Sequence, residues 1–238
     1  TNYGKELFPY IKNVQNSEEY LQQAVAQIGG MEKGVVRIGT FNSACVEWMP
    51  SLLRGFEKDY PNIRIDIYQG SYDDVYQWLK DGIVDLGFLS STSAGDLSCT
   101  PIYPDTIICV APQGFKTENE GYITIEELKK QRFVTQREGC DADVNHVMNK
   151  YDLPGGGGSY IADDMSAVSL VMGGFGVCLM PELVIRNIPF PVDVIPLEVE
   201  EKRTIVLAYV RSDVLAPAVQ KMQSYILESF QKKAEEEQ

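Results

Sequence analysis

Hydroxyl and amide side chains gather at three points of the chain where a strand is expected to end. They are Thr40, Asn42, Ser43, Ser71 and Ser90. Ligands of open α/β sheets bind at the carboxyl ends of the strands, where helix N-termini also present N–H groups to an anion. These five residues are therefore candidate contacts for a small polar ligand. We also expect Asn42 or Ser43, and likewise Ser71, to cap the helices that follow, with or without a ligand.

A second group of candidates follows a short strand expected at 133–134. Thr135 and Gln136 lie at the end of this strand and could donate hydrogen bonds to a ligand. Cys140 lies just before a helix expected at 142–151, and a thiol at a helix N-terminus can have a lowered pKa. Cys140 therefore has two interpretations, as a residue that lines a pocket or as a redox sensor. We favour the first.

Residues that could support catalysis are scarce. His146 is the only histidine, and without a second histidine or a Cys-x-x-Cys pair a zinc site is not expected. The serines lack the G-x-S-x-G context of a nucleophile elbow, and no glycine-rich phosphate loop joins a strand to a helix. The aspartate pairs at 73–74 and 163–164 begin helices, where the helix dipole accounts for them. We therefore expect a binding protein without cofactor or metal, and not an enzyme.

Hydrophobic patterning over 35–89 predicts a strand–helix–strand–helix–strand unit. The isoleucines of 63–67 alternate with polar residues, as in a strand with one wet face. Such a unit implies parallel pairing with right-handed crossovers. The expected elements are strands at 35–39, 63–67 and 83–89, a helix at 45–59, and a second helix between Ser71 and Gly82.

The second half of the chain continues to alternate strands and helices. Thr124 with Glu127 forms a capping box, and Asp163 and Pro217 begin two further helices. The segment 155–159 reads GGGGS, which is either a natural loop or an engineered flexible linker. Further strands are expected at 106–110, 160–162, 177–180, 192–195 and 204–210.

The N-terminal segment 1–30 carries a heptad seam. Its members are Leu7, Ile11, Val14, Leu21, Val25 and Ile28, with Glu18 interrupting the series. Such a helix could pack on its own domain, or it could pair with another copy. We favour pairing, because about three heptads follow a proline near the first turn.

Composition restricts the function further. The 238 residues include 21 basic and 34 acidic residues, a net charge of −13 that makes DNA binding by this chain itself unfavourable. Five cysteines without paired spacing indicate reduced thiols. No apolar run approaches the ~20 residues of a membrane span, and the N-terminus lacks a secretory pattern. We expect a cytoplasmic protein with no membrane contact.

The chain resembles the effector-binding domain of LysR-type transcriptional regulators. Four motifs in order carry this resemblance over nearly the whole chain: G-x-x-R-I-G, M-P-x-L-L-x-x-F-x-x-x-Y-P, L-x-x-G-x-x-D-L-G and G-G-F-G-V-C-L-M-P. It implies an α/β, two-lobed, type 2 periplasmic-binding-protein-like fold with two crossover strands, preceded by a linker helix. The linker would be 1–30, lobe I would be 34–111 with 211–238, and lobe II would be 112–210.

The resemblance also implies a function. A small organic acid or a similar polar metabolite would bind as effector in the cleft between the lobes and change the angle between them. DNA would be bound only through a winged helix-turn-helix that this chain lacks. The assembly would be a homodimer or homotetramer, in which linker helices pair and effector domains pair antiparallel through 63–67 and 45–59.

Three alternatives remain open from the sequence. A solute-binding protein of a transporter uses a similar fold, although the heptad helix and the cysteines argue against it. Peroxide-sensing members of the same family have a reactive cysteine near the position of Cys140, but no second cysteine follows at 147–151. An enzyme on the same fold is the least favoured, because no nucleophile context was found.

Overall fold

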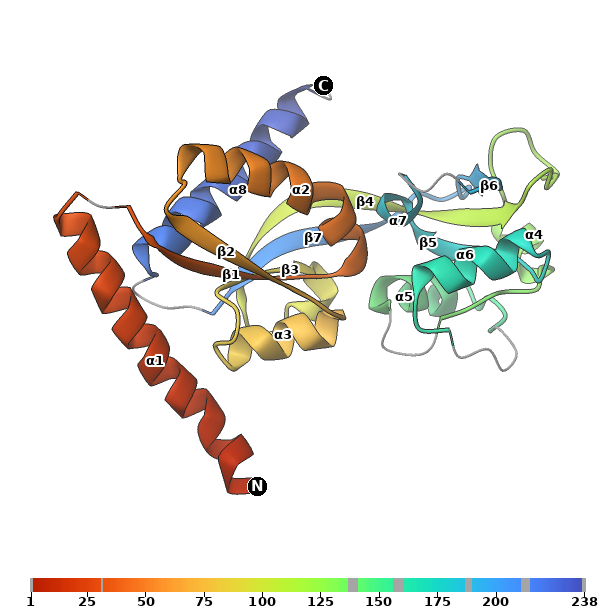
Figure 1. Cartoon of the computed structure of the whole chain (residues 1–238). Coiled ribbons are helices and arrows are strands. Elements are labelled where there is room, and N and C mark those ends of the chain that lie inside the picture. The colour runs from red at the N-terminus through yellow and green to blue at the C-terminus, as the bar shows by residue number, and fades with distance from the viewer. Residues whose placement is uncertain are drawn as a thin grey trace. The chain divides into compact units, whose positions relative to one another are not determined.

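The chain forms two compact units that are described separately. Unit 1 contains Thr1–Tyr103 and Ile205–Gln238, and unit 2 contains Pro104–Thr204 (Figure 1). The computed structural model describes residues 2–30, 32–136, 141–155, 161–186, 190–210 and 215–236.

Two strands belong to both units. They are β4, Ser98–Pro112, and β7, Glu201–Tyr209. The unit boundaries therefore fall inside these strands. The sequence showed only the apolar part of β4 at 106–110, because Pro101 and Pro104 masked its extended first half.

Strand β1, Gly34–Thr40, is the centre of unit 1. It pairs in parallel with β2, Ile63–Gln69, on one side and with β3, Leu86–Ser90, on the other. The order within the sheet is β2-β1-β3-β7-β4, with β3 and β7 antiparallel. The predicted parallel pairing is confirmed. Strand β3 begins three residues later than predicted, because Gly82 takes a φ of 68° in the turn before it.

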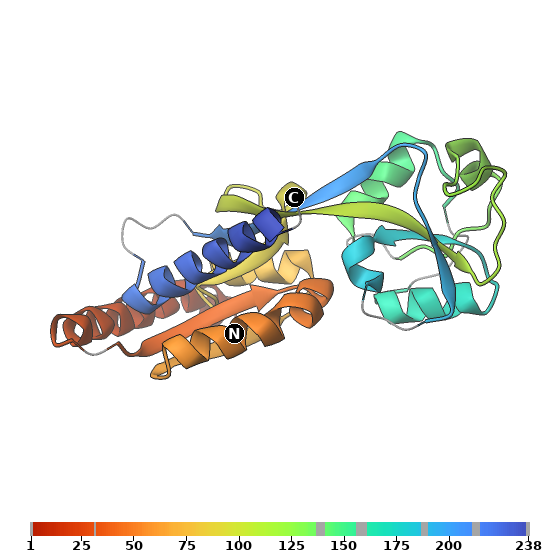
Figure 2. The same ribbon diagram turned by 90° about the horizontal axis from the view of Figure 1, so that it is seen from above.

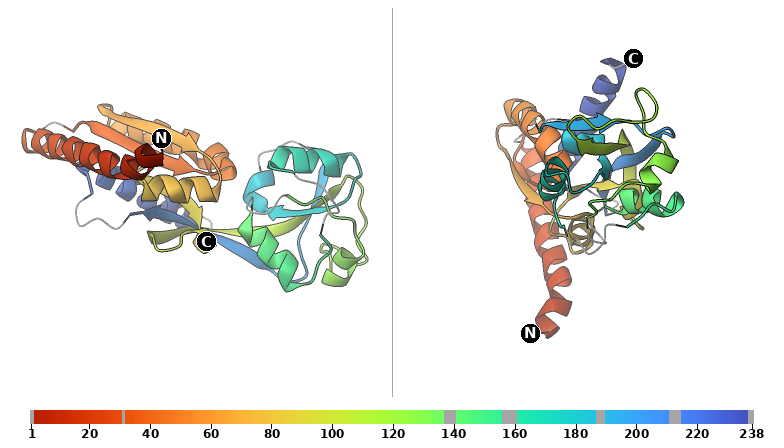
Figure 3. Two further views of the ribbon diagram at one scale, coloured as in Figure 1. Left: turned by 90° about the horizontal axis from the view of Figure 1, so that it is seen from below. Right: turned by 90° about the vertical axis from the view of Figure 1, so that its right-hand side faces the viewer.

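Helices cover both faces of the unit 1 sheet. Helices α2, Asn42–Asp59, and α8, Pro217–Glu236, lie over one face (Figure 2), and α3, Tyr72–Lys80, lies over the other (Figure 3). Trp48 of α2 is fully buried, with ring centroids 5.9 Å from Phe88 and 4.7 Å from Phe230. Burial of such aromatic area is the main favourable term in the core of the unit.

Glycines allow α3 to approach the other face closely. A Cβ atom on Gly87 would lie 2.8 Å from both Val75 and Leu79 of α3, and one on Gly39 would lie 3.0 Å from Val75. The glycines of the G-x-x-R-I-G and D-L-G motifs therefore have a packing role.

Unit 2 is built on the apolar half of β4. Strands β5, Cys178–Pro181, and β6, Val192–Ile195, both pair with it antiparallel. Phe133 and Gln136 form only isolated bridges, with Val177 and Ile161, so the predicted strands at 133–134 and 160–162 are not regular strands within the described residues. Of the GGGGS segment, only Gly155 lies in the described part. The helices are α4 Ile125–Lys129, α5 Ala142–Lys150, α6 Asp164–Met172 and α7 Glu182–Ile185.

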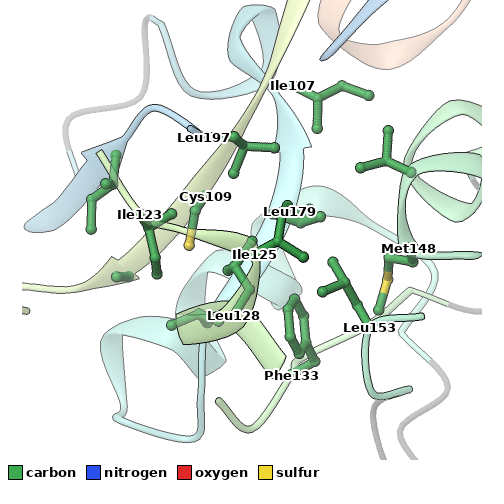
Figure 4. Packing of buried hydrophobic residues seen from close by; sticks show 14 residues of the cluster. Ile107, Cys109, Ile123, Ile125, Leu128, Phe133, Met148, Leu153, Leu179 and Leu197 are labelled. Atoms are coloured by element: carbon green, nitrogen blue, oxygen red, sulfur yellow. The ribbon is translucent and has the colours of Figure 1, made fainter. Parts of the chain in front are cut away.

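Alternation along β4 gives unit 2 two apolar clusters. Cys109 and its odd-numbered neighbours face the cluster that contains Leu128 and Phe133 (Figure 4), whereas Ile108 and Val110 face the cluster of α6 and α7. A strand covered on both faces is expected to be a continuous apolar run, as 107–111 is.

The N-terminal segment is helical as predicted. Helix α1, Asn2–Ile28, contains Pro9 near its start and belongs to unit 1. Among the described residues, none of the helices combines the length and apolar character needed to cross a membrane.

Leu128→Ala tests the packing of unit 2. Leu128 is completely buried in the cluster of Figure 4, so its truncation should leave a cavity and lower the free energy of unfolding by about 2–5 kcal/mol. Urea unfolding followed by circular dichroism measures the change. Val199→Ala, at a side chain that is 44% exposed, is the control and should stay within about 0.5 kcal/mol of the wild type. Equal effects of the two substitutions would contradict this packing.

Candidate functional sites

Two of the predicted ligand contacts are the last residues of neighbouring strands in unit 1. Thr40 is the last residue of β1 and Ser90 is the last residue of β3, and neither is exposed. The Thr40 hydroxyl donates to the carbonyl of Phe41 at 3.2 Å, and the Ser90 hydroxyl lies 3.0 Å from that of Thr92. Because β1 and β3 are parallel, both residues lie at the same edge of the sheet.

The start of α2 differs from the sequence-based expectation. Its N-cap is Phe41, which makes no side-chain cap bond, so the prediction that Asn42 or Ser43 caps this helix is wrong. The difference arises because the chain is already helical at Asn42. Ser43 is buried in the first turn and Asn42 is exposed.

Ser71 caps α3 as predicted. Its hydroxyl oxygen accepts a hydrogen bond from the backbone N–H of Asp74 at 3.2 Å, and the Asp74 carboxylate accepts from the Ser71 N–H at 2.9 Å. The Ser71 hydroxyl also lies 2.7 Å from the Asp74 carboxylate. The structure therefore confirms the capping role, and ligand contact by Ser71 stays a prediction.

In unit 2, Thr135 and Gln136 line a small cavity. Its volume is about 20 Å³, which holds a single water-sized group. Apolar side chains form the remainder of the wall together with Asn145 and two carboxylates, Asp141 and Asp164. The Gln136 amide donates to Asp164 at 2.6 Å. Cys140, the third candidate of this group, lies outside the described residues.

Asp141 is a functional candidate that the sequence analysis treated only as a cap. One carboxylate oxygen accepts from the N–H groups of Asp143 at 3.1 Å and Val144 at 3.0 Å, which caps α5. The other oxygen is 3.9 Å from a guanidinium nitrogen of Arg203. Burial raises the pKa of Asp141 to about 6, although Arg203 opposes the rise.

Arg203 itself belongs to a buried ion pair that no sequence pattern indicated. Its guanidinium lies 2.7 Å and 2.8 Å from one oxygen of Asp105, and both side chains are almost fully buried. The second oxygen of Asp105 accepts from the N–H of Leu183 at the start of α7. Asp105 lies in β4 and Arg203 in β7, so this pair joins the two shared strands inside unit 2.

The described thiols differ in their exposure. Burial raises the pKa of Cys109 to about 12 and raises that of Cys178 further, so both stay protonated as core residues. Cys45 is half-buried, and Cys99 is exposed. His146 is exposed on α5. Within the described residues, no three metal-binding side chains come together.

The heptad seam of α1 faces away from unit 1. All six apolar members are exposed, from 55% at Leu7 to 89% at Ile28. On the opposite side of the helix, Asn16, Gln23 and Ala26 are buried against unit 1. Within the described part of the chain, the seam is therefore an uncovered apolar surface, which agrees with the pairing interpretation.

A protein-family model, the LysR substrate binding domain, matches residues 29–231. Among curated proteins, the transcriptional dual regulator GltC of Bacillus subtilis is 23% identical over 98% of this chain and 79% of its own length. Among solved structures, the effector binding domain of QuiR in complex with shikimate has a TM-score of 0.73 at 19% identity, covering 84% of this chain and 98% of its own.

A second solved structure covers almost all of the chain. A peroxide-bound mutant of OxyR from Corynebacterium glutamicum has a TM-score of 0.76 at 20% identity, over 98% of this chain and 76% of its own. At these identities the similarity establishes the fold. The predicted type 2 periplasmic-binding-protein-like fold is thereby confirmed.

Asp141→Asn tests the raised pKa of this carboxyl group. An unfolded aspartate titrates near ~3.9, whereas Asp141 titrates at about 6 in the folded chain. The folded state therefore holds the extra proton between these values, so this group lowers the free energy of unfolding as pH rises from about 4 to about 6. Asparagine keeps a side-chain oxygen that can accept the cap hydrogen bonds, and it does not titrate, so it makes no pH-dependent contribution to the free energy of unfolding.

The measurement is urea unfolding of both proteins between pH 4 and pH 7.5. Relative to Asp141→Asn, the wild type should lose roughly 1–3 kcal/mol across the window and then level off. Asp73→Asn, at an exposed residue in the first turn of α3, controls for general charge effects. A difference between wild type and Asp141→Asn that does not change with pH would contradict the raised pKa.

Proposed function

Because the chain belongs to the LysR substrate-binding domain family, we propose that it is the effector-sensing part of a DNA-binding transcriptional regulator. The match over residues 29–231 is the observation that carries this proposal. We assign DNA binding to another part of the regulator, since the net charge of −13 disfavours phosphate contacts by this chain. Neither of the other functions considered, solute delivery to a transporter and thiol-based sensing, is favoured by the comparisons.

We propose that residues of each unit contribute to effector binding. In unit 1 these are Thr40, Asn42, Ser43, Ser71 and Ser90. The hydroxyls of Thr40 and Ser90 lie at the carboxyl ends of parallel strands, and α2 and α3 begin beside them. Helix N-termini favour an anionic group, so we assign a carboxylate of a small organic acid to this side.

In unit 2 we propose Thr135, Gln136 and Cys140 as contacts. The described wall here is rich in acceptors, because Asp141 and Asp164 line the same cavity as Thr135 and Gln136. Carboxylates repel a second acid group and accept hydrogen bonds from hydroxyl or amino groups. We therefore favour an effector that carries a carboxylate together with hydroxyl or amino groups over a plain dicarboxylic acid.

We also propose that the whole regulator is a homodimer or a homotetramer. The exposed apolar seam of α1 supports pairing between copies. Strand β2 is an edge strand, at the end of the sheet order, and Val46 of α2 is 59% exposed. Both features fit the antiparallel pairing of effector domains that the family implies.

A thermal-shift screen with single substitutions tests effector binding. Hydroxy acids, amino acids and dicarboxylic acids form three arms, and peroxide forms a fourth. A ligand at ~100 times its dissociation constant should stabilise the folded chain by ~2.7 kcal/mol. Ser43→Ala and Thr135→Ala should each weaken binding about 5- to 10-fold, the usual effect of losing one hydrogen bond of ~1 kcal/mol.

The matched controls also remove a serine hydroxyl, but at positions away from the proposed site. Ser224→Ala on the exposed surface of α8 and Ser169→Ala on that of α6 should leave binding unchanged. A ligand whose affinity survives both Ser43→Ala and Thr135→Ala would show that it binds elsewhere. A response to peroxide alone that is lost in Cys140→Ser would replace the effector proposal with thiol-based sensing.

Leu21→Glu tests pairing through α1. Placing a charge on the seam should make burial between two copies unfavourable and raise the dissociation constant of the dimer at least 10-fold. Sedimentation velocity across a concentration series measures it. Gln27→Glu adds the same charge to an exposed position of α1 outside the seam and should have no effect. An unchanged dissociation constant for Leu21→Glu would exclude the seam as the pairing surface.

A further inference from the structure

Helix α1 meets unit 1 through a cluster of polar side chains. We call this cluster the α1 latch, and its members are Asn16, Glu19, Tyr20, Arg37 and Asp85. We propose that the latch fixes the rotation of α1 on unit 1, so that the apolar seam is held facing outward for pairing. Arg37 and Asp85 act as positioning residues in this scheme. The role of the latch in directing the seam rests on the proposed pairing, whereas the latch contacts themselves lie within one chain.

The latch is anchored on two neighbouring strands. Arg37, in the middle of β1, is 7% exposed, and its backbone N–H donates to the Asp85 carboxylate at 2.7 Å. The backbone N–H of Asp85, just before β3, donates in return to the carbonyl of Arg37 at 2.8 Å. The two hydrogen bonds between Arg37 and Asp85 therefore do not depend on α1.

Helix α1 then supplies one partner to each anchor. The Glu19 carboxylate accepts from the Arg37 guanidinium at 2.7 Å, and the Tyr20 hydroxyl donates to the second oxygen of Asp85 at 3.0 Å. Glu19 and Tyr20 are adjacent in sequence, so both bonds form only when one particular side of the helix faces the sheet. Charge-assisted bonds of this kind depend strongly on direction.

One turn earlier, Asn16 contacts the turn before β3. Its amide donates to the carbonyl of Gly82 at 2.8 Å, and a Cβ atom on Gly82 would lie 3.0 Å from the same nitrogen. The Asn16 amide oxygen is buried and has no hydrogen-bond partner among the described residues. A buried polar atom without a hydrogen-bond partner is unfavourable, so the asparagine is not explained by stability alone. A buried asparagine is best known for fixing register, as in coiled coils.

The latch and the seam lie on opposite sides of one helix. At 3.6 residues per turn, the direction midway between residues 16, 19, 20 and 23 is about 180° from that of the heptad seam. Gln23 continues the packed side, because its side chain accepts from the N–H of Ala218 at 3.3 Å. An α1 rotated by half a turn would bury the seam against unit 1. It would also leave Arg37 and Asp85 without their helix partners, which is unfavourable for buried charges.

The anchors are poor choices for the first test, because removing a buried charge can prevent folding. The helix side offers a milder variant, Glu19→Gln with Tyr20→Phe, which leaves the Arg37–Asp85 contacts intact. Glu6→Gln is the control, since it makes the same charge-removing replacement at an exposed position of the same helix that is outside the latch and the seam. All variants are made in the full 238-residue chain.

Hydrogen exchange followed by mass spectrometry measures how firmly α1 is held. In Glu19→Gln/Tyr20→Phe, amides of residues 13–26 should exchange at least 10-fold faster than in the wild type, while those of β1, β3 and unit 2 stay within two-fold. The dimer dissociation constant should rise as well. The control variant should match the wild type in both measurements.

Three results would overturn the proposal. Unchanged exchange in α1 would mean that the latch does not hold the helix. Equally faster exchange in β1 and β3 would mean that Glu19 and Tyr20 act only on general stability. Faster exchange in α1 with an unchanged dissociation constant would mean that the latch does not set the pairing direction. Failure of Leu21→Glu to affect association would refute pairing through the seam, and the exchange result would still decide whether the latch holds α1.

Discussion

The parallel pairing of β1 with β2 and β3 is the constraint on which the rest of unit 1 depends. Parallel neighbours require helical crossovers, so α2 and α3 must cover the two faces of the sheet. Close packing of α3 in turn requires glycine at positions 39 and 87. The same direction of the strands brings Thr40 and Ser90 to one edge, and the Arg37 side chain in the middle of β1 contacts α1.

Most elements of the fold could be predicted from the sequence, because apolar periodicity follows from burial on one face of a helix or on both faces of a buried strand. The strands expected at 133–134 and 160–162 are not regular in the described residues, and α7 was not expected. Capping patterns correctly predicted Ser71 and Thr124 as the N-caps of α3 and α4. The same reasoning failed at α2, whose N-cap is the aromatic residue Phe41. The ion pairs were missed because they form between residues far apart in sequence. Arg37, for instance, interrupts an otherwise apolar strand, and nothing local indicates that its partner is Glu19.

The positions of the candidate ligand contacts could be predicted where they depend on local structure, and could not where they depend on tertiary packing. Strand direction alone places Thr40 and Ser90 at a sheet edge, but the acidic wall beside Thr135 depends on how α5 and α6 pack. Asp141 and Asp164 each begin a helix, and local sequence explains them fully as caps or first-turn residues. Only the tertiary structure shows that both line one cavity with Gln136. The acidic lining of this cavity is a feature that composition does not reveal.

The separation of latch and seam on opposite sides of α1 has a consequence for evolution. A bacterial genome can hold many regulators of one family, and their subunits must avoid mixed pairs. Because the apolar members of the seam are exposed and none belongs to the latch, they can diverge between duplicated genes without changing the latch contacts that attach the helix. In the proposed pairing, partner choice and helix attachment could then vary independently, so that a newly duplicated regulator could stop exchanging subunits with its parent through substitutions along the seam.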